Sequence, residues 1–361
     1  MIDLLLNNEV WYGFYMVAAN TPLNSLNYVA ILKAKRGELR ASKESNLDHF
    51  IPLFEVLDNK NDLDSNKIVQ VNKGSSNIIW VQLMNYRNLN NSSWPNRITD
   101  YFTKLHNQGC AAVPVVTSDE NQATYNAVGN IVAVQQRGLV IRIDCEETSA
   151  NLSTVSSRVK RALKQCGVSE YQCDIIVDAG FVSGTAVHQA STMALMLNEI
   201  PNISLWRSVV ASFSGFPSSV GDVVSANSVQ RIPRTDAFAF NALTKSWTDR
   251  KLVFSDYGVG VPTYSNVNWA PIPNIRYTIP DYWVIHRAAQ QRTPGPQYVQ
   301  LAKSVVNAPY FQGSSFSSGD QYLNDVALAV DGPGNAETYL RVAMNHHFAQ
   351  VLDSLATHGA P

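Results

Sequence analysis

The chain has 361 residues, of which 45% are hydrophobic and 16% are charged, and its formal net charge is -1. This composition excludes a disordered chain, and the near-zero charge excludes a protein-wide positive field that attracts nucleic acid, while a local basic site stays compatible with it. The four cysteines show no C-x-x-C spacing, so we expect neither a zinc site nor a disulfide framework, and a reducing, cytoplasmic setting.

Residues 1–26 are expected to be an N-terminal extension. Their apolar stretch has Asp3 and Glu9 where a signal peptide needs basic residues, and Asn7, Asn8 and Glu9 interrupt it before it is long enough to span a bilayer. We therefore expect a docked segment or edge element and no membrane partner.

From residue 27 onward, eight short apolar runs alternate with amphipathic stretches. The runs are rich in Val, Ile and Phe without strict alternation, which is typical of strands covered on both faces. They begin at Tyr28, Phe50, Asn77, Ala111, Gly138, Cys173, Ser204 and Lys251. Eight strands with intervening helices predict an α/β fold, a (β/α)8 TIM-barrel-like domain over residues 27–260, with an open α/β sheet as the alternative.

Residues 261–361 have a different character, because Pro, Asn and aromatic residues dominate the first part. This part reads as a long loop leading to a hairpin formed by "IRYTI" and "YWVIHR". Helices are expected in "PGPQYVQLAKSVVNAP" and in "NAETYLRVAMNHHFAQVLDSLAT". The sequence predicts that this C-terminal loop, hairpin and helix region packs on the barrel or caps its mouth.

Polar residues stand at the end of nearly every predicted strand. Ligands of parallel α/β folds bind beyond these carboxyl ends, so the positions are candidate site residues. A carboxylate after four apolar residues is expensive to desolvate unless it is paired or lies at a solvated mouth, and Glu55, Asp144, Asp178 and Asp256 fit that description. Other ends contribute Lys33, Lys35, Glu38, Gln82, Thr117, Arg142, Ser212, Ser255 and Tyr257.

Three chemistries remain open for a shared polar mouth. Carboxylates with Lys or Arg suit a phosphate-bearing substrate, with Lys33 and Lys35 binding phosphate and with Glu55, Asp144 and Asp256 as acid–base groups or ligands of Mg²⁺ or Mn²⁺. Two carboxylates alone suit glycoside hydrolysis. The third alternative is a binding pocket without turnover.

Residues outside the strand ends add weaker candidates. The adjacent His346 and His347 point about 100° apart on a helix, so only one of them can face the mouth, and we assign His346 as an accessory acid. Arg234 and Arg276 each stand near acids and aromatic residues, where an Arg fork either binds phosphate or clamps a loop.

Eight segments together resemble the T-even phage beta protein family. In chain order they are "YVAILKAKRGELRA", "IPLFEV", "SFSGFP", "IPRTDAFAF", "FSDYGVGVP", "NIRYT", "FSSGDQYL" and "NHHF", and they run from residue 28 to about 348. Ala237 departs from the family pattern, which has an aromatic residue after the Arg-x-Asp step, and Tyr339 stands where the family has Trp.

The resemblance implies a common family but no particular reaction, since the family has no established activity and supplies no catalytic roles. Its members in phages and bacterial genomes imply a role in phage–host conflict. It also implies a set of landmark positions, several of which coincide with the strand ends. They are Lys33, Lys35, Glu38, Glu55, Arg234, Asp236, Asp256, Tyr257, Arg276, Tyr277, Asp320, His346 and His347.

The combined prediction is a cytoplasmic hydrolase or lyase acting on a nucleotide or nucleic-acid substrate. Its catalytic residues are Glu55, Asp144, Asp256 and His346, and Arg142, Asp178, Arg234, Tyr257, Arg276 and Tyr277 join Lys33, Lys35 and Glu38 in substrate binding. The alternative is a non-catalytic sensor or inhibitor that binds a phage or host protein or a small signal, and a glycosidase is third. The sequence leaves the oligomeric state open.

Overall fold

The computed structural model describes residues 21–45, 47–57, 64–75, 77–85, 93–144, 149–182, 184–264 and 271–361. Most of the predicted N-terminal extension, residues 1–20, lies outside the described residues. Within the described ranges, no helix is both long and apolar enough to cross a membrane.

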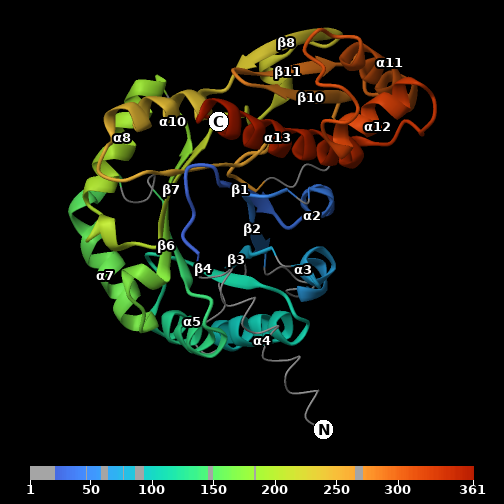
Figure 1. Cartoon of the computed structure of the whole chain (residues 1–361). Coiled ribbons are helices and arrows are strands. Elements are labelled where there is room, and N and C mark those ends of the chain that lie inside the picture. Colours follow the sequence, from blue (N-terminus) through green and yellow to red (C-terminus); the bar gives the residue numbers. More distant parts are fainter. Residues whose placement is uncertain are drawn as a thin grey trace.

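Eight parallel strands close into a barrel in the order β1-β2-β3-β4-β5-β6-β7-β9 (Figure 1). This closure confirms the predicted (β/α)8 architecture and excludes the open sheet, and each predicted apolar run supplies one strand. The strands are β1 Tyr28–Lys33, β2 Phe50–Leu57, β3 Ile79–Met84, β4 Ala112–Thr117, β5 Leu139–Asp144, β6 Cys173–Phe181, β7 Ser208–Ser214 and β9 Val253–Asp256.

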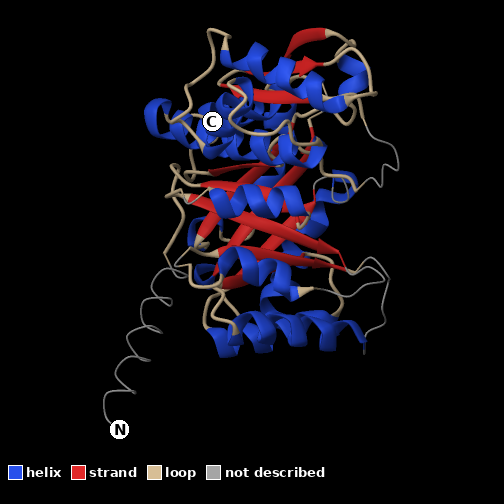
Figure 2. Cartoon of the chain, turned by 90° about the vertical axis from the view of Figure 1, so that its right-hand side faces the viewer, coloured by secondary structure: helices blue, strands red, loops and turns tan. Residues whose placement is uncertain are grey.

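Helices surround this barrel and cover the outer faces of the strands (Figures 1 and 2). They correspond to the amphipathic stretches of the sequence, and α7, for example, ends at Cys166 because Gly167 adopts a φ of 67°, which favours glycine. The barrel helices are α2 Arg36–Glu44, α3 Ser65–Asn72, α4 Ser93–Asn107, α5 Gln122–Gln135, α7 Val155–Cys166, α8 Ala186–Asn198 and α10 Thr235–Ser246. Shorter helices are the 3-10 turns Ser149–Thr154, Glu170–Gln172 and Ile203–Leu205, and α9 Val220–Val223.

The barrel interior changes from apolar to polar along the strands. Val29, Ile31, Leu53, Val140 and Trp80 belong to the inner apolar cluster. Strand alternation then puts Lys33, Glu55 and Arg142 on the same inner faces, two residues farther along β1, β2 and β5. The polar end of the barrel is therefore its carboxyl end, where barrel enzymes place their active sites.

A second, antiparallel sheet of order β10-β11-β8 forms the core of an additional layer beside the barrel. The hairpin β10 Asn274–Ile279 and β11 Tyr282–Arg287 confirms the predicted one, and α11 Pro294–Val306 and α12 Ser318–Ala327 pack with it. The third strand, β8 Ser228–Pro233, comes from within the range predicted as barrel. Sequence reasoning missed β8 because its side chains are mostly exposed and form no apolar run.

Helix α13, Ala336–His358, joins the second layer to the barrel. It packs against β10 on one side and α2 on the other, and in Figure 1 it lies between α10 and α2, where it completes the ring of barrel helices. Phe348 is fully buried, with its ring 4.6 Å from that of Phe50 and 6.2 Å from that of Tyr28. The C-terminal helix is thus part of the barrel wall.

Phe348→Ala is expected to lower the free energy of unfolding by about 3–5 kcal/mol, because the truncation leaves a cavity between α13 and the strands. Urea unfolding followed by circular dichroism measures this, with Val330→Ala as a control because Val330 is 75% exposed. A loss below about 1 kcal/mol for Phe348→Ala would show that α13 does not hold the barrel wall.

Candidate active site

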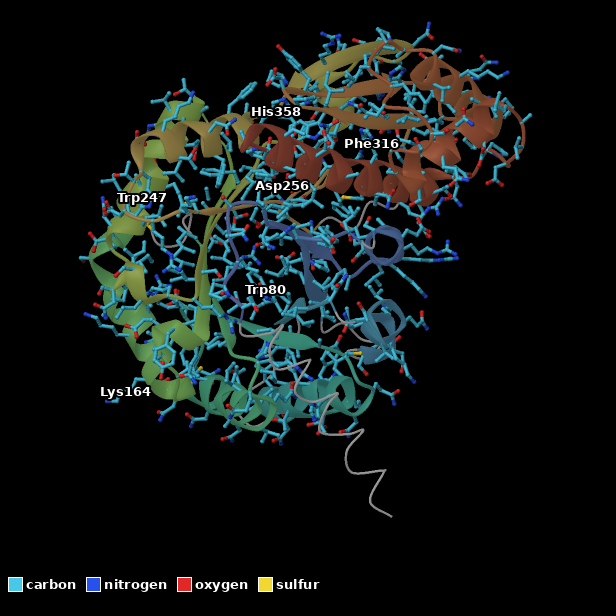
Figure 3. All side chains as sticks on the ribbon, in the orientation of Figure 1. Trp80, Lys164, Trp247, Asp256, Phe316 and His358 are labelled. Atoms are coloured by element: carbon cyan, nitrogen blue, oxygen red, sulfur yellow. The ribbon has the colours of Figure 1, made fainter. Side chains whose placement is uncertain are left out.

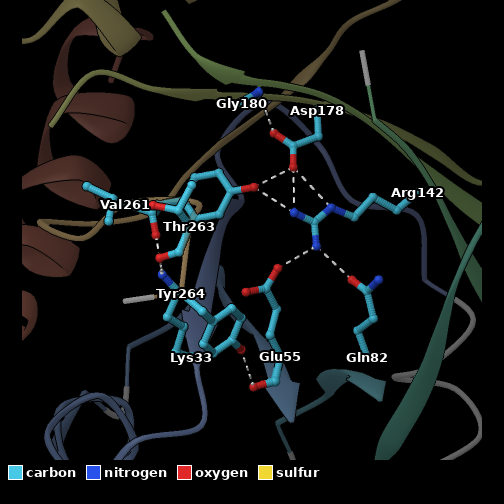
Figure 4. Close-up of polar contacts among 10 residues, drawn as sticks. Lys33, Glu55, Gln82, Arg142, Asp178, Gly180, Val261, Thr263 and Tyr264 are labelled. Carbon is cyan, nitrogen blue, oxygen red and sulfur yellow. Dashed lines mark hydrogen bonds and ion pairs between the residues drawn. The ribbon is translucent and has the colours of Figure 1, made fainter. Parts of the chain in front are cut away.

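Arg142 forms the centre of the polar barrel end (Figure 4). Its Nη1 donates to Glu55 Oε1 and to Gln82 Oε1, both at 2.7 Å. Its Nη2 donates to Asp178 Oδ2 and the Tyr257 hydroxyl, both at 2.6 Å, and its Nε donates to Asp178 Oδ2 at 3.0 Å. The five N–H groups of the guanidinium are therefore all used inside the protein.

The charges of this network compensate one another in a buried site. Burial opposes the positive charge of Arg142, but Tyr257, Asp178 and Glu55 more than offset this and keep the pKa of the guanidinium above its ordinary value. Burial, together with Asp178, also raises the pKa of the Tyr257 phenol, which stays protonated and donates to Asp178 Oδ2 at 2.5 Å. Asp178 is fully engaged, since its Oδ1 accepts from the Gly180 N–H.

The chain that follows β9 crosses the carboxyl end of the barrel and accepts hydrogen bonds from Lys33. The Lys33 ammonium donates to the backbone oxygens of Val261 and Thr263 and lies 4.7 Å from the centre of the Tyr264 ring. The Tyr264 hydroxyl donates to the Glu55 backbone oxygen at 3.1 Å. We call residues 257–264 the strap. Burial lowers the pKa of Lys33, although Glu55 and Glu38 oppose this.

Four buried polar atoms in this interior have no hydrogen-bond partner within the part of the chain that the structure describes. They are Glu55 Oε2, Ser212 Oγ, Ser214 Oγ and Ser255 Oγ. The serines follow the interior residues Val210 and Val253 at even spacing along β7 and β9, so their hydroxyls face the interior. Buried polar atoms are normally paired, so these four mark a place for polar groups of a ligand or for water.

Glu38 lies beside this network in the first turn of α2 and is buried. Its Oε2 has no partner among the described residues. Burial raises the pKa of Glu38 to about 8, because Lys33, Lys35 and backbone N–H groups offset the desolvation only in part. The carboxyl group is therefore mostly protonated at pH 7.

A groove of about 800 Å³ opens between α2 and α3 and reaches the carboxyl ends of β1 and β2. We call it the α2–α3 groove. Two carboxylate residues, Glu55 and Asp64, and two tyrosines, Tyr101 and Tyr264, contribute to its lining. Its cationic residues are Lys35, Arg36, Arg40, Lys43 and Lys67. Glu55 is thus shared between the Arg142 network and a predominantly basic groove.

Asp256, predicted as a catalytic residue, belongs to a different network. It lies beside α13 (Figure 3), where it accepts from the Tyr28 hydroxyl at 2.5 Å and contacts His347 Nε2 at 2.8 Å. Burial would raise the pKa of Asp256, but His347, Arg234 and the Tyr28 hydroxyl lower it below the usual range. Asp256 faces out of the barrel because it alternates with the inward-facing Tyr257.

His346, predicted as an accessory acid, contacts no residue of the Arg142 network. Its ring contacts Asp320 Oδ2 and the Thr278 backbone oxygen, both at 2.8 Å, and stacks on Tyr277 at 3.8 Å between ring centres. Tyr277 in turn donates to Asp320 at 2.8 Å. These residues form the interior of the second layer, so the landmark positions there serve packing.

The two remaining predicted arginines clamp chain segments. Arg234 is fully buried and pairs with Asp236 at 3.2 Å, next to the Asp256 network. Arg276 donates to the Val259 backbone oxygen at 2.7 Å and lies over the Phe216 ring. Arg276 therefore ties β10 to the strap instead of lining the groove.

The predicted metal ligands do not come together. Glu55 is in the Arg142 network, Asp256 faces α13, and Asp144 is exposed at the end of β5. Among the residues that the structure describes, no three His, Cys, Asp or Glu side chains are arranged to hold a metal ion. The described donor set thus does not fit the Mg²⁺ or Mn²⁺ site that we expected from the strand ends.

Sequence reasoning missed Tyr264, Arg40, Lys43 and Lys67. Tyr264 lies in a loop with no periodicity, and no spacing rule connects it to Glu55. A signal for Arg40 and Lys43 was present, because together with Arg36 they follow a helical i, i+4, i+7 spacing. Their basic stripe is visible in the sequence only once α2 is assigned.

Comparison with known families gives a match to the family described as Beta protein over residues 28–353. The chain belongs to this family. The match covers the barrel strands, the second layer and most of α13, which agrees with the segments that carried the resemblance. Comparison with curated protein sequences gives no significant match.

Several solved structures show weak similarity to this Beta protein family member. The YdjI aldolase from Escherichia coli K12 has a TM-score of 0.39 and 9% identity, covering 96% of both chains. A dihydropteroate synthase from Coxiella burnetii has a TM-score of 0.38 and 15% identity over 66% of this chain and 88% of that one. A 2,3-dimethylmalate lyase has a TM-score of 0.36 and 10% identity over 68% and 80%.

Arg142→Met is expected to destabilise the protein by about 3–5 kcal/mol, because it leaves Glu55 and Asp178 buried without their counter-charge. Urea unfolding at pH 7 measures the change. Arg292→Met is the matched control, since Arg292 is exposed in the turn before α11. Equal stability of the two variants would contradict a central role for the guanidinium.

The raised pKa of Glu38 predicts a pH dependence of stability. In the unfolded chain Glu38 ionises around its ordinary pKa of 4.5, whereas in the folded protein burial raises its pKa to about 8, so that ionisation is delayed to higher pH. Its contribution is full below the unfolded value and is lost as the pH rises towards 8.

Wild type should therefore lose stability relative to Glu38→Gln between pH 5 and 8, with a limiting slope of about 1.4 kcal/mol per pH unit. Urea unfolding at intervals across this range measures the difference, and Asp48→Asn, which alters an exposed carboxyl, should follow wild type. Parallel curves for wild type and Glu38→Gln would show that Glu38 ionises normally.

Proposed function

We propose that this Beta protein family member is a hydrolase of phosphoesters that uses acid–base catalysis at the carboxyl end of its barrel. The observation that carries the proposal is the environment of Glu55. Its Oε1 is held by Arg142 at 2.7 Å, while its Oε2 is buried and has no partner among the described residues. The same residue lines the basic α2–α3 groove.

The substrate class follows from the charge of the groove. Lysine and arginine side chains bind phosphate oxygens with charge-assisted hydrogen bonds, and arginine does so in a bidentate manner. Five such residues line the groove next to Glu55. Lys33, which we first expected to bind phosphate, donates instead to the strap, so Lys35 and Arg40 are the better phosphate ligands.

In the proposed reaction, Glu55 Oε2 accepts a proton from a water molecule. The water oxygen forms a bond to phosphorus, and the bond between phosphorus and the leaving oxygen breaks. Glu55 then gives the proton to the leaving oxygen and returns to the carboxylate form. Arg142 holds Glu55 in place, and Tyr264 must move away from Glu55 to admit the phosphate.

A glycosidase fits less well, because glycoside hydrolysis needs two available carboxyl groups. Asp178, the other carboxylate of the network, uses both of its oxygens within the protein. Glu55 thus stands as a single acid–base group beside cations, an arrangement that suits phosphoester chemistry better.

The second candidate is a non-catalytic sensor or inhibitor. Two observations favour it: every N–H group of Arg142 already donates to a protein group, and the strap lies across the carboxyl end of the barrel. In this case the groove binds an anionic ligand and Glu55 performs no chemistry. For either candidate we propose phage–host conflict as the setting, based on the family resemblance.

Glu55→Gln is expected to lower kcat/KM by about 10²–10⁴-fold, because it removes the group that exchanges the proton. The measurement is turnover of a panel that contains bis(p-nitrophenyl) phosphate and nucleotides. Asp222→Asn, an exposed acid in α9, is the control and should keep wild-type rates.

Gln keeps the hydrogen bond to Arg142 but removes one of its two counter-charges, so circular dichroism must show that Glu55→Gln is folded at the assay temperature. Turnover that survives in Glu55→Gln would rule out the proposed role. Wild-type protein that binds the panel ligands without turning any over, with binding unchanged by Glu55→Gln, would favour the non-catalytic candidate.

A further inference from the structure

We propose that the α2–α3 groove binds a single-stranded polynucleotide and that the phosphodiester at its inner end is the one presented to Glu55. This inference rests on the proposed function, because it names the substrate class of the same site. It is carried by the spacing of the cations, by the absence of ion pairs between four of them and any described carboxylate, and by the two tyrosines of the groove.

The cations on α2 form a row along the groove. Arg36, Arg40 and Lys43 are at positions i, i+4 and i+7, so they share one face of the helix. At 1.5 Å per residue the row spans about 10 Å along the axis. In duplex DNA each strand carries one charge per about 3.4 Å of helix axis, and an extended single strand carries fewer charges per unit length, so a row of this length meets about two or three consecutive phosphates.

A single nucleotide matches this row poorly. Its phosphates are grouped at one end, so they contact one or two of the cations and leave the others unused. A polynucleotide places a phosphate opposite each cation in turn. The row therefore favours a chain of phosphodiesters over a free nucleotide.

Most of these cations have no other charged partner in the described ranges. Arg36 pairs with the exposed Glu337 at 3.2 Å. Lys35, Arg40, Lys43 and Lys67 are exposed and form no ion pair with a described carboxylate. Lys67 stands on α3, across the groove from the row, so cations line both walls. Asp64 is occupied in part, since its side chain accepts from the Asn66 N–H.

The tyrosines add the second, independent observation. Tyr101 is 2% exposed and lines the groove, yet its hydroxyl has no partner among the described residues. A buried hydroxyl without a partner is able to donate to a ligand group in the groove. Tyr264 lies at the inner end beside Glu55, and its ring is available to stack on a base once it moves, as aromatic residues do in single-strand binding sites.

The test is fluorescence anisotropy with a labelled 12-residue oligothymidylate between 50 and 200 mM salt. For single strands, log Kobs falls with log salt by about 0.7 for each phosphate contact. The variant Arg40→Gln/Lys43→Gln/Lys67→Gln should lower this slope by about 2 and weaken binding at least about tenfold at low salt. The control variant Lys160→Gln/Lys164→Gln/Lys245→Gln removes the same charge from exposed sites elsewhere and should keep the wild-type slope.

Circular dichroism checks the fold of each variant, and the single variant Lys43→Gln, with an expected slope change of about 0.7, serves if the triple variant does not fold. Absence of oligothymidylate binding, or an equal slope in both triple variants, overturns the inference. So does thymidine monophosphate that binds as tightly as the oligonucleotide.

The inference and the proposed function fail in different ways. Loss of turnover of bis(p-nitrophenyl) phosphate in Glu55→Gln, with no oligonucleotide binding to wild type, rejects the inference alone. Oligonucleotide binding with the expected slopes, with turnover that does not depend on Glu55, rejects the function alone.

Discussion

The carboxyl end of the barrel depends on one buried positive charge. A guanidinium inside a barrel is stable only if its charge and its donors are satisfied, and Arg142 meets this condition through Glu55, Gln82, Asp178 and Tyr257. These partners come from β2, β3, β6 and the strap, so one side chain fixes the relative positions of four parts of the chain. Glu55 is held in this way by one oxygen, and its other oxygen has no partner among the residues that the structure describes.

The junction between β9 and the strap connects this interior to α13. Asp256 and Tyr257 are consecutive and alternate in direction, so Asp256 contacts His347 of α13 while Tyr257 contacts Arg142. Lys33 then holds the strap farther along, through the Val261 and Thr263 backbone oxygens. Two adjacent residues therefore contact α13 on one side and the Arg142 network on the other.

The sequence predicted the barrel because few other folds accommodate eight apolar strands that alternate with amphipathic helices. It failed at β8, whose exposed side chains carry no burial pattern, and whose place is set by pairing with β11. At the site, the structure places the inward-facing strand ends Lys33, Glu55, Arg142 and Asp178 at the carboxyl end of the barrel, and their role there stays a prediction. The sequence could not show that Asp256 and His346 lie outside this network. Whether the last residue of a strand points into or out of the barrel, and where α13 packs, depend on the tertiary structure. The groove was missed for the same reason, since it needs α2 and α3 side by side.

If Glu55 Oε2 acts on a phosphodiester in the α2–α3 groove, a crystal structure with a phosphorothioate dinucleotide, which resists hydrolysis, will show this contact. We expect a phosphorothioate within hydrogen-bond distance of Glu55 Oε2, contacts from Lys35 and Arg40, and Tyr264 displaced from the Glu55 backbone oxygen. A dinucleotide bound elsewhere, or Glu55 Oε2 paired with a protein group while the groove is occupied, would contradict it.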